Sequence, residues 1–267
     1  MGLIQQLRGA PRALKVILIG YLRIILKRLG FRLISTGDEK DSRSKGVHLN
    51  IGSGGYEIDG FLSVDYFSDG YYANKQFDCI HYDMRGDNLP FEDDSVDTIY
   101  CSHVIEHIET EYVEMFFKES FRVLKLGGVL RIVCPDVEYL YNNLKDNPEY
   151  FSWHPRYRNI DDALICFIDE VANPKVEIDS FGLKQQWSDY DYDELLEDLR
   201  SDLKFDERIP NDHINSWDFG RISSFVKISG FSCVTRSRCQ GSYRAALRGG
   251  DMDLTMPQMS LYVDVRK

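Results

Sequence analysis

The stretch LNIGSGGYEIDG, residues 49–60, decides the fold of this chain. A short apolar run leads into Gly52, Ser53, Gly54 and Gly55, and no clear helix pattern begins after them. Glycines at this density lose much backbone entropy on folding and contribute no side-chain packing. In an α/β sheet, ligands bind at the carboxyl ends of the strands, where a bare backbone lets them approach closely. The stretch therefore predicts a ligand-binding turn after the first strand of such a sheet.

The rest of the chain also favours an α/β domain with a parallel sheet, because short apolar runs alternate with helical patterns. Residues 111–128 predict a helix with apolar side chains on one face and a glycine stop. Two further helices are expected over residues 137–144 and from residue 218 onward. The expected strands are residues 47–51, 61–67, 77–83, 96–104, 128–136, 231–239 and 260–267.

The chain is acidic overall, and its charge is unevenly distributed. A net charge of -11 argues against a nucleic-acid partner, because phosphate binding needs a basic face. Residues 1–45 carry ten Lys and Arg against three acids, whereas residues 136–212 carry eight against twenty. We therefore expect a basic amphipathic N-terminal helix and linker over residues 1–45. A second unit, residues 46–267, would carry an acidic insertion at about 139–210.

In the basic segment, Arg and Lys recur at near-helical spacing beside aliphatic residues. Its uncharged stretch, residues 16–22, is too short to span a bilayer. Such a helix would lie on an anionic inner membrane surface, pack on the domain or a partner, or be removed as a transit peptide. The six cysteines show no CxxC spacing, and several lie in apolar runs, so we expect reduced thiols in a cytoplasmic protein.

Asp65 stands at the end of the second expected strand, where an acid can hold a ribose diol. The dinucleotide fingerprint also requires a third small residue, but this chain has Glu57 at that position. The turn therefore suits a nucleoside without a pyrophosphate better than NAD or FAD.

Four segments together resemble class I S-adenosylmethionine-dependent methyltransferases, namely residues 49–55, 63–67, 82–108 and 121–136. The chain is similar to the small bacterial methyltransferases associated with cell-surface polysaccharide synthesis. The resemblance implies a Rossmann-like methyltransferase fold over residues 46–267. Its seven-stranded sheet would be mostly parallel, with helices on both faces and an antiparallel last strand.

The same resemblance implies S-adenosylmethionine as the cofactor and gives the glycine turn a role. Gly52, Ser53 and Gly54 would pass under the methionine half of the cofactor, and Gly55 would complete the turn. Asn50 stands where many relatives carry an acid, which makes the site less negative toward the cofactor's ammonium group.

The resemblance also assigns the nucleoside half of the cofactor. Asp65 would accept hydrogen bonds from both ribose hydroxyls, and Tyr66 would lie on the adenine face. Asp83 ends the third strand and would accept from the adenine amino group, while Met84 supplies an apolar wall.

Methyl transfer to a sugar hydroxyl requires a base that works near neutral pH. Ser102 and His103 end the fourth strand and would face the transferable methyl, so His103 is the first candidate for a catalytic base. His213, just before the last helix, is the second, and His154 is the third. Each also has a simpler interpretation, as a cofactor contact, a helix cap or a packed side chain.

Residues 103–107 also match the zinc-peptidase pattern H-x-x-E-H. On a helix these side chains would share a face and could bind a metal. Here the pattern begins inside the fourth strand, and no motif supplies a clear ligand further along the chain. We therefore expect Glu106 and His107 to open the next helix, where an acid favours the helix dipole, and we expect no metal.

These features together predict O-methylation of a sugar or lipid-linked glycan by in-line methyl transfer. The expected partner is a small-molecule or glycan acceptor, with peripheral membrane contact through the N-terminal helix. The alternative is a non-catalytic, cofactor-binding subunit of a larger assembly.

Overall fold

The computed structural model describes residues 43, 45–66, 79–186 and 191–267. The strands are β1 (His48–Ile51), β2 (Leu62–Asp65), β3 (Ile80–His81), β4 (Val96–Ser102), β5 (Leu124–Pro135), β6 (Cys233–Arg236) and β7 (Ser260–Arg266). The α-helices are α4 (Thr110–Val123), α5 (Val137–Asp146), α6 (Ala163–Gln186), α7 (Tyr192–Arg200) and α8 (Phe219–Ile228). Short 3₁₀ helices are η3 (Ile105–His107), η4 (Pro148–Trp153), η5 (Ile160–Asp162) and η7 (Ala245–Leu247).

The described strands form one seven-stranded sheet in the order β3-β2-β1-β4-β5-β7-β6. The first five pair in parallel, and β7 lies antiparallel between β5 and β6. This arrangement confirms the expected fold class. The chain order of the strands reverses between β1 and β4, so their carboxyl ends form the switch point at which such sheets bind ligands.

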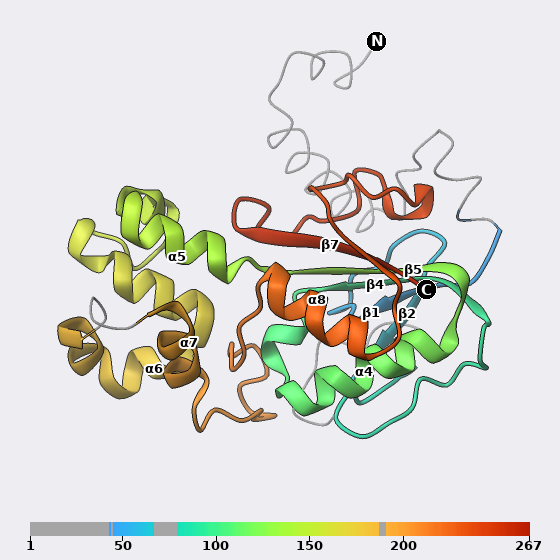
Figure 1. The fold of residues 1–267 in the computed structure, drawn as a ribbon, viewed down its shortest axis with the longest axis horizontal. Coiled ribbons are helices and arrows are strands. Elements are labelled where there is room, and N and C mark those ends of the chain that lie inside the picture. Colours follow the sequence, from blue (N-terminus) through green and yellow to red (C-terminus); the bar gives the residue numbers. More distant parts are fainter. Residues whose placement is uncertain (1–42, 44, 67–78, 187–190) are drawn as a thin grey trace, which may run out of the picture.

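One face of the sheet carries the main hydrophobic core. Helices α4 and α8 pack on it and on each other (Figure 1). Phe116 and Phe117 from α4 are fully buried there, together with Trp217, which precedes α8. The indole Nε1–H of Trp217 donates to the carbonyl of Ile105 at 3.0 Å. Trp217 in the core therefore holds the start of η3, the short helix that follows β4.

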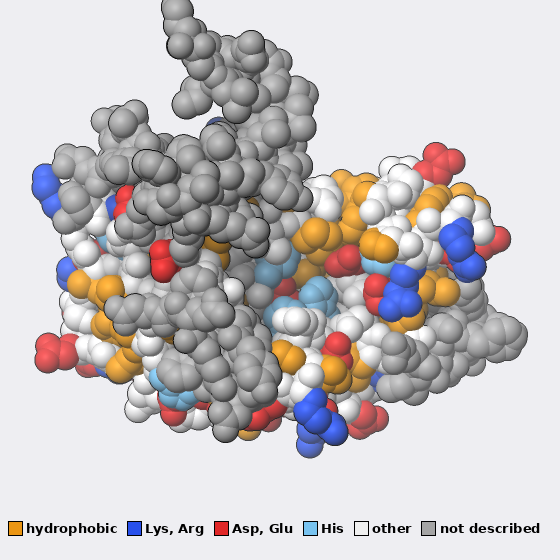
Figure 2. All heavy atoms as spheres, turned by 180° about the vertical axis from the view of Figure 1, so that it is seen from behind, with side chains coloured by type: hydrophobic (Ala, Val, Ile, Leu, Met, Phe, Trp, Pro, Cys, Tyr) orange, Lys and Arg blue, Asp and Glu red, His pale blue; other side chains and the backbone are white. Residues whose placement is uncertain are grey.

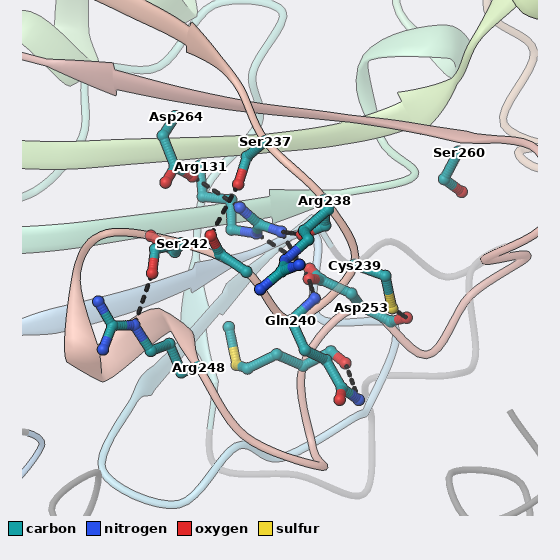
Figure 3. A network of polar contacts seen from close by, with 12 residues as sticks. Arg131, Ser237, Arg238, Cys239, Gln240, Ser242, Arg248, Asp253, Ser260 and Asp264 are labelled. Carbon is teal, nitrogen blue, oxygen red and sulfur yellow. Dashed lines mark hydrogen bonds and ion pairs between the residues drawn. The ribbon is translucent and has the colours of Figure 1, made fainter. Parts of the chain in front are cut away.

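The opposite face of the sheet contains a buried ionic cluster. Arg131 of β5 donates to Asp253 at 2.6 Å and to Asp264 of β7 at 2.7 Å, and all three side chains are at most 1 % exposed (Figure 3). The carboxylates hold the pKa of Arg131 above its ordinary value, although burial alone would lower it. The segment with η7 and Met252 covers this face beside the cluster. Arg131 thus ties the last strand and this covering segment to the middle of the sheet.

Helices α5, α6 and α7 with η4 and η5 form a separate layer at one end of the sheet (Figure 1). Their apolar side chains make a second hydrophobic cluster that includes Phe151, Phe167 and Leu196. The segment that was expected to be an acidic insertion therefore contains helices with a core of their own. No helix in the described part of the chain is long and apolar enough to cross a membrane. The predicted basic helix lies outside the described residues.

Two predicted boundaries are wrong. The strand expected over residues 96–104 ends at Ser102, so the H-x-x-E-H segment follows the strand, and Glu106 and His107 lie in the short helix η3. The helix expected over residues 111–128 ends at Val123, and β5 begins at Leu124. Leu124 pairs with Val96 and is fully buried, while the backbone N–H of Gly127 donates to Lys267 at 3.0 Å. Pairing with the sheet therefore overrides the local helical pattern. Cys101, Cys134 and Cys166 are buried thiols, whereas Cys79, Cys233 and Cys239 are only partly buried.

Candidate active site

A cleft opens at the carboxyl ends of β1, β2 and β4, with about 700 Å³ of space that includes open solvent. Its lining comes from three regions that are far apart in the sequence. These residues are Ile51, Gly52, Asp65 and Tyr66; then Tyr82 to Arg85, His103, Val104, His107 and Ile108; and finally Phe205, Pro210 and Asn211. Figure 2 shows histidine side chains grouped near the middle of one face of the molecule.

The glycine turn is shaped by its backbone and by a close neighbour. Gly52 has φ +64°, and a Cβ added there would lie 2.2 Å from a methyl carbon of Val104. Gly54 has φ +54°, but a Cβ added there would meet nothing within 4 Å. Both residues need a conformation that L side chains rarely adopt. Of these two glycines, only Gly52 has a neighbour so close that a side chain would not fit. Gly52 also lines the cleft.

Asp65 holds this turn in place. Its carboxylate accepts hydrogen bonds from the backbone N–H of Gly54 at 2.7 Å, from the hydroxyl of Ser53 at 3.2 Å and from the N–H of Tyr66 at 2.8 Å. The side chain amide of Asn50 donates to the carbonyl of Tyr56 at 2.9 Å, across the base of the same turn. The acid at the end of β2 therefore orders the loop as well as facing the cleft.

A stacked arginine lines the cleft near the ends of β2 and β3. The guanidinium of Arg85 donates to both carboxylate oxygens of Asp83, at 2.9 and 2.8 Å. It also lies 4.8 Å from the ring centroid of Tyr66 and 4.1 Å from that of Phe205. Burial opposes the charge, but the contact with Asp83 raises the pKa of Arg85 above its ordinary value. A cation between two rings is a favourable contact in itself.

Sequence reasoning missed Arg85 and Phe205. Arg85 carried a signal, because it follows the strand-ending acid by two residues. Phe205 had none, because it reaches the cleft from the segment after α7. Of the predicted cofactor residues, six line the cleft: Gly52, Asp65, Tyr66, Asp83, Met84 and His103. The remaining five are not in its lining: Asn50, Ser53, Gly54, Gly55 and Ser102.

His103 is held on both sides of its ring. Its Nδ1 lies 3.0 Å from Oε1 of Glu106, and its Nε2 lies 2.9 Å from the hydroxyl of Ser260. Its backbone has φ +54°, which is uncommon for a residue with a side chain and turns the chain sharply after β4. Glu106 is 1 % exposed. Burial raises the pKa of this carboxyl, but the hydrogen bond from His103 and the neighbouring histidines outweigh burial and lower the pKa to about 2.

A second pair of histidines lies beside the first. The rings of His107 and His213 are 4.9 Å apart between centroids. Nδ1 of His107 contacts the carbonyl of Asp212 at 3.0 Å, and Nδ1 of His213 contacts the carbonyl of Glu170 at 2.6 Å. Burial lowers the pKa of His107, so its ring is neutral near pH 7.

The structure therefore brings His213 to the cleft through His107, although it is not itself in the lining. His154 lies in the helical layer instead. It is 3.3 Å from both Asp169 and Glu170 and has no place in the cleft lining.

Residues 63–132 match a family model described as a methyltransferase domain. The matched stretch runs from β2 into β5 and contains both Asp65 and His103. The chain carries a methyltransferase domain. Its cofactor is S-adenosylmethionine, as the resemblance implied. No curated protein matches the chain.

Solved structures with similar architecture include two methyltransferases that depend on this cofactor. The one from Archaeoglobus fulgidus is 14% identical, covers 93% of this chain and 94% of that chain, and has a TM-score of 0.45. The one from Mesorhizobium loti is 17% identical, covers 83% of this chain and 91% of that chain, and has a TM-score of 0.42. At these values neither likeness says anything about the acceptor of the methyltransferase domain.

Proposed function

We propose that this methyltransferase domain transfers the methyl group of S-adenosylmethionine to an oxygen of a sugar or a lipid-linked glycan. One observation carries the proposal. The cleft combines an acid-anchored glycine turn, suited to the cofactor, with histidines that can accept a proton from a hydroxyl. A sugar hydroxyl is a poor nucleophile, and a positioned base removes its proton as the bond to carbon forms.

The described residues fit the cofactor. Gly52 and Asp65 line the same space, and Val104 packs where a side chain of residue 52 would lie. Asp65 lines the cleft, where its carboxylate would accept a hydrogen bond from a ribose hydroxyl. Tyr66 and Met84 would flank the adenine. When bound, the cofactor supplies a methyl group on a positively charged sulfur.

Asp83 needs a change of partner to fulfil its predicted role. Its carboxylate is engaged by Arg85, whose guanidinium also covers one side of Tyr66. We propose that Arg85 moves aside or lies over the adenine ring when the cofactor binds, so that Asp83 can accept from the amino group.

His103 is the proposed base. Glu106 beside Nδ1 orients the ring and stabilises the imidazolium that forms when the ring gains a proton. The hydroxyl of Ser260 occupies the hydrogen-bonding position at Nε2, which an acceptor hydroxyl would take. Ser260 can give up this contact because its hydroxyl can donate instead to the carbonyl of Met256, which lies 2.8 Å away.

The proposals for the acceptor class and for the localisation of the protein rest on the sequence. We propose that the basic segment 1–45 holds the protein on the anionic inner face of a membrane, near lipid-linked acceptors. Vesicles with and without anionic lipid, mixed with the full chain and separated by flotation, test this placement. Binding that is equal on neutral and anionic vesicles would contradict it.

Calorimetry of S-adenosylmethionine binding to the full chain is the first test of the proposed function. Asp65→Ala should abolish binding, whereas Glu111→Ala, an exposed acid of α4, should leave it unchanged. His103→Ala should keep cofactor binding and lower methyl transfer to glycan acceptors by about 10²- to 10⁴-fold, the usual contribution of a general base. A folded wild type that binds no cofactor would refute the proposal. Full methyl transfer by His103→Ala would refute the assigned base.

A further inference from the structure

Three side chains from distant parts of the sequence converge beside the cleft. One ligand atom each from Glu106, His107 and His213 lies within 4.8 Å of the other two. Glu106 and His107 belong to η3, whereas His213 comes from the segment before α8. The backbone fixes this approach, because the carbonyl of Glu106 accepts from the N–H of Ile214 at 2.9 Å and from that of Asn215 at 3.0 Å. The cluster is therefore part of the fold.

The hydrogen bonds of the two histidines leave the same nitrogen free on each ring. Both Nδ1 atoms contact backbone carbonyls, from Asp212 and Glu170 respectively. A carbonyl oxygen can only accept, so each Nδ1 carries the proton. Each Nε2 then has a lone pair. This is the arrangement in which metal-binding histidines are usually held, with the second nitrogen donating to a carbonyl.

The burial of Glu106 also points to a bound cation. The side chain is 1 % exposed, and neither of its carboxylate oxygens receives a well-directed hydrogen bond from any residue in the described ranges. Nδ1 of His103 lies 3.0 Å from Oε1. A buried carboxylate oxygen without a donor is costly, because it has lost its hydration without replacement. Among the described residues, this applies most clearly to Oε2, which has no hydrogen-bond partner there.

We propose that Glu106, His107 and His213 bind a divalent transition-metal ion such as Zn²⁺. Two imidazoles and one carboxylate are a common ligand set for this ion, with bond lengths of about 2.0–2.2 Å. Such bonds place ligand atoms about 3.4 Å apart in a tetrahedron, so the cluster would contract by about 1 Å. Oε1 of Glu106 would keep its contact with His103, while Oε2 would bind the ion. His103 would then orient the metal ligand through Nδ1, in addition to its proposed role as the base.

The ion would have a position left for the acceptor. Three protein ligands leave the fourth site of a tetrahedral ion open, and His107 itself lines the cleft. This step rests on the proposed function. A hydroxyl oxygen bound to the ion would lose its proton to Nε2 of His103 and keep the electron pair. That pair would form the bond to the methyl carbon as the bond from this carbon to the cofactor's sulfur breaks, and S-adenosylhomocysteine would leave. His213 would then act as a ligand and not as a second base.

The test measures metal binding by the full chain without cofactor or acceptor. The protein is stripped with a chelator, dialysed against Zn²⁺ or Co²⁺, and its metal content is measured by mass spectrometry. The wild type and His81→Ala, which changes an exposed histidine outside the cluster, should hold one ion per chain. His213→Ala and His107→Ala should weaken binding by at least about 100-fold.

The visible spectrum of the Co²⁺-loaded wild type gives a readout that does not depend on whether a variant folds. A four-coordinate ion absorbs much more strongly than hydrated Co²⁺. A weak spectrum like that of the hydrated ion would overturn the proposal. So would metal content that is unchanged in both histidine variants, which would mean adventitious binding, for example by the partly exposed thiols.

The outcomes separate this inference from the proposed function. Loss of cofactor binding in Asp65→Ala with no metal bound by the wild type would refute only the metal site. Stoichiometric metal with no cofactor binding would refute only the proposed methyl transfer.

Discussion

Replacing Gly52 by alanine tests whether the glycine turn is set by packing as well as by its backbone angle. A non-glycine residue in the left-handed region costs about 1–2 kcal/mol. The added Cβ would also lie 2.2 and 3.1 Å from the two methyl carbons of Val104 and 3.3 Å from its Cβ. Carbon atoms pack at about 3.5–4.0 Å. Rotating the Val104 side chain moves its methyls but not its Cβ, so the overlap cannot be fully relieved.

Overpacking of this kind costs about 1–3 kcal/mol. Together with the backbone strain, Gly52→Ala should therefore lower the free energy of unfolding by about 2–5 kcal/mol. Gly54→Ala is the matched control, because its φ is +54° and nothing lies within 4 Å of the added carbon. It should cost only the backbone strain, about 1–2 kcal/mol.

Urea unfolding of both variants, each also combined with Val104→Ala, gives the answer. In the Val104→Ala background, Gly52→Ala should cost about 1–3 kcal/mol less than in the wild type. The cost of Gly54→Ala should not change. Equal losses for the two glycine variants would refute the packing argument, as would a Gly52→Ala cost that Val104→Ala leaves unchanged. Titration with S-adenosylhomocysteine then shows whether the strained turn still binds the nucleoside.

Three further predictions concern the scaffold of the site. Glu119→Gln should lower the free energy of unfolding by about 1 kcal/mol at pH 7, and the variant should lose less of its stability in acid than the wild type. The reason is that Arg122 holds the pKa of Glu119 below its ordinary 4.5. That stability is present above pH 4.5 and disappears as the pH falls through the lowered pKa. Arg131→Met leaves two buried carboxylates facing each other and should cost about 3–5 kcal/mol by urea unfolding. Trp217→Phe removes the hydrogen bond to Ile105 and should cost about 1–3 kcal/mol in the same assay.

Each of these has an outcome that would contradict it. An acid transition of Glu119→Gln that follows the wild type would show that this carboxylate contributes nothing to the pH dependence. If Arg131→Met costs no more than Arg208→Ala, a change at an exposed arginine, the buried cluster is not held by its charge pairs. Unchanged unfolding of Trp217→Phe would mean that the carbonyl of Ile105 is satisfied without the indole.

Much of the fold could be predicted because it depends on local patterns. The strand at residues 96–102 contains the apolar run Ile99–Cys101 and is mostly buried, as expected for a central strand of a sheet covered on both faces. The end of the helix before β5 could not be predicted, because Leu124 gains more from pairing with Val96 than from another helical turn. Helical periodicity says nothing about a competing partner in the sheet.

The sequence by itself predicted which strand ends meet at the cleft. The glycine turn, Asp65 and His103 all lie at strand ends, and parallel strands place their ends at one edge whatever the loops do. Only the tertiary structure decided the rest of the cleft. Phe205 and His213 arrive from segments with no strand register, through contacts such as the one between Glu106 and Ile214. Long-range packing of this kind leaves no periodic signal in the chain, so the meeting of His213 with Glu106 and His107 appears only once the chain is folded.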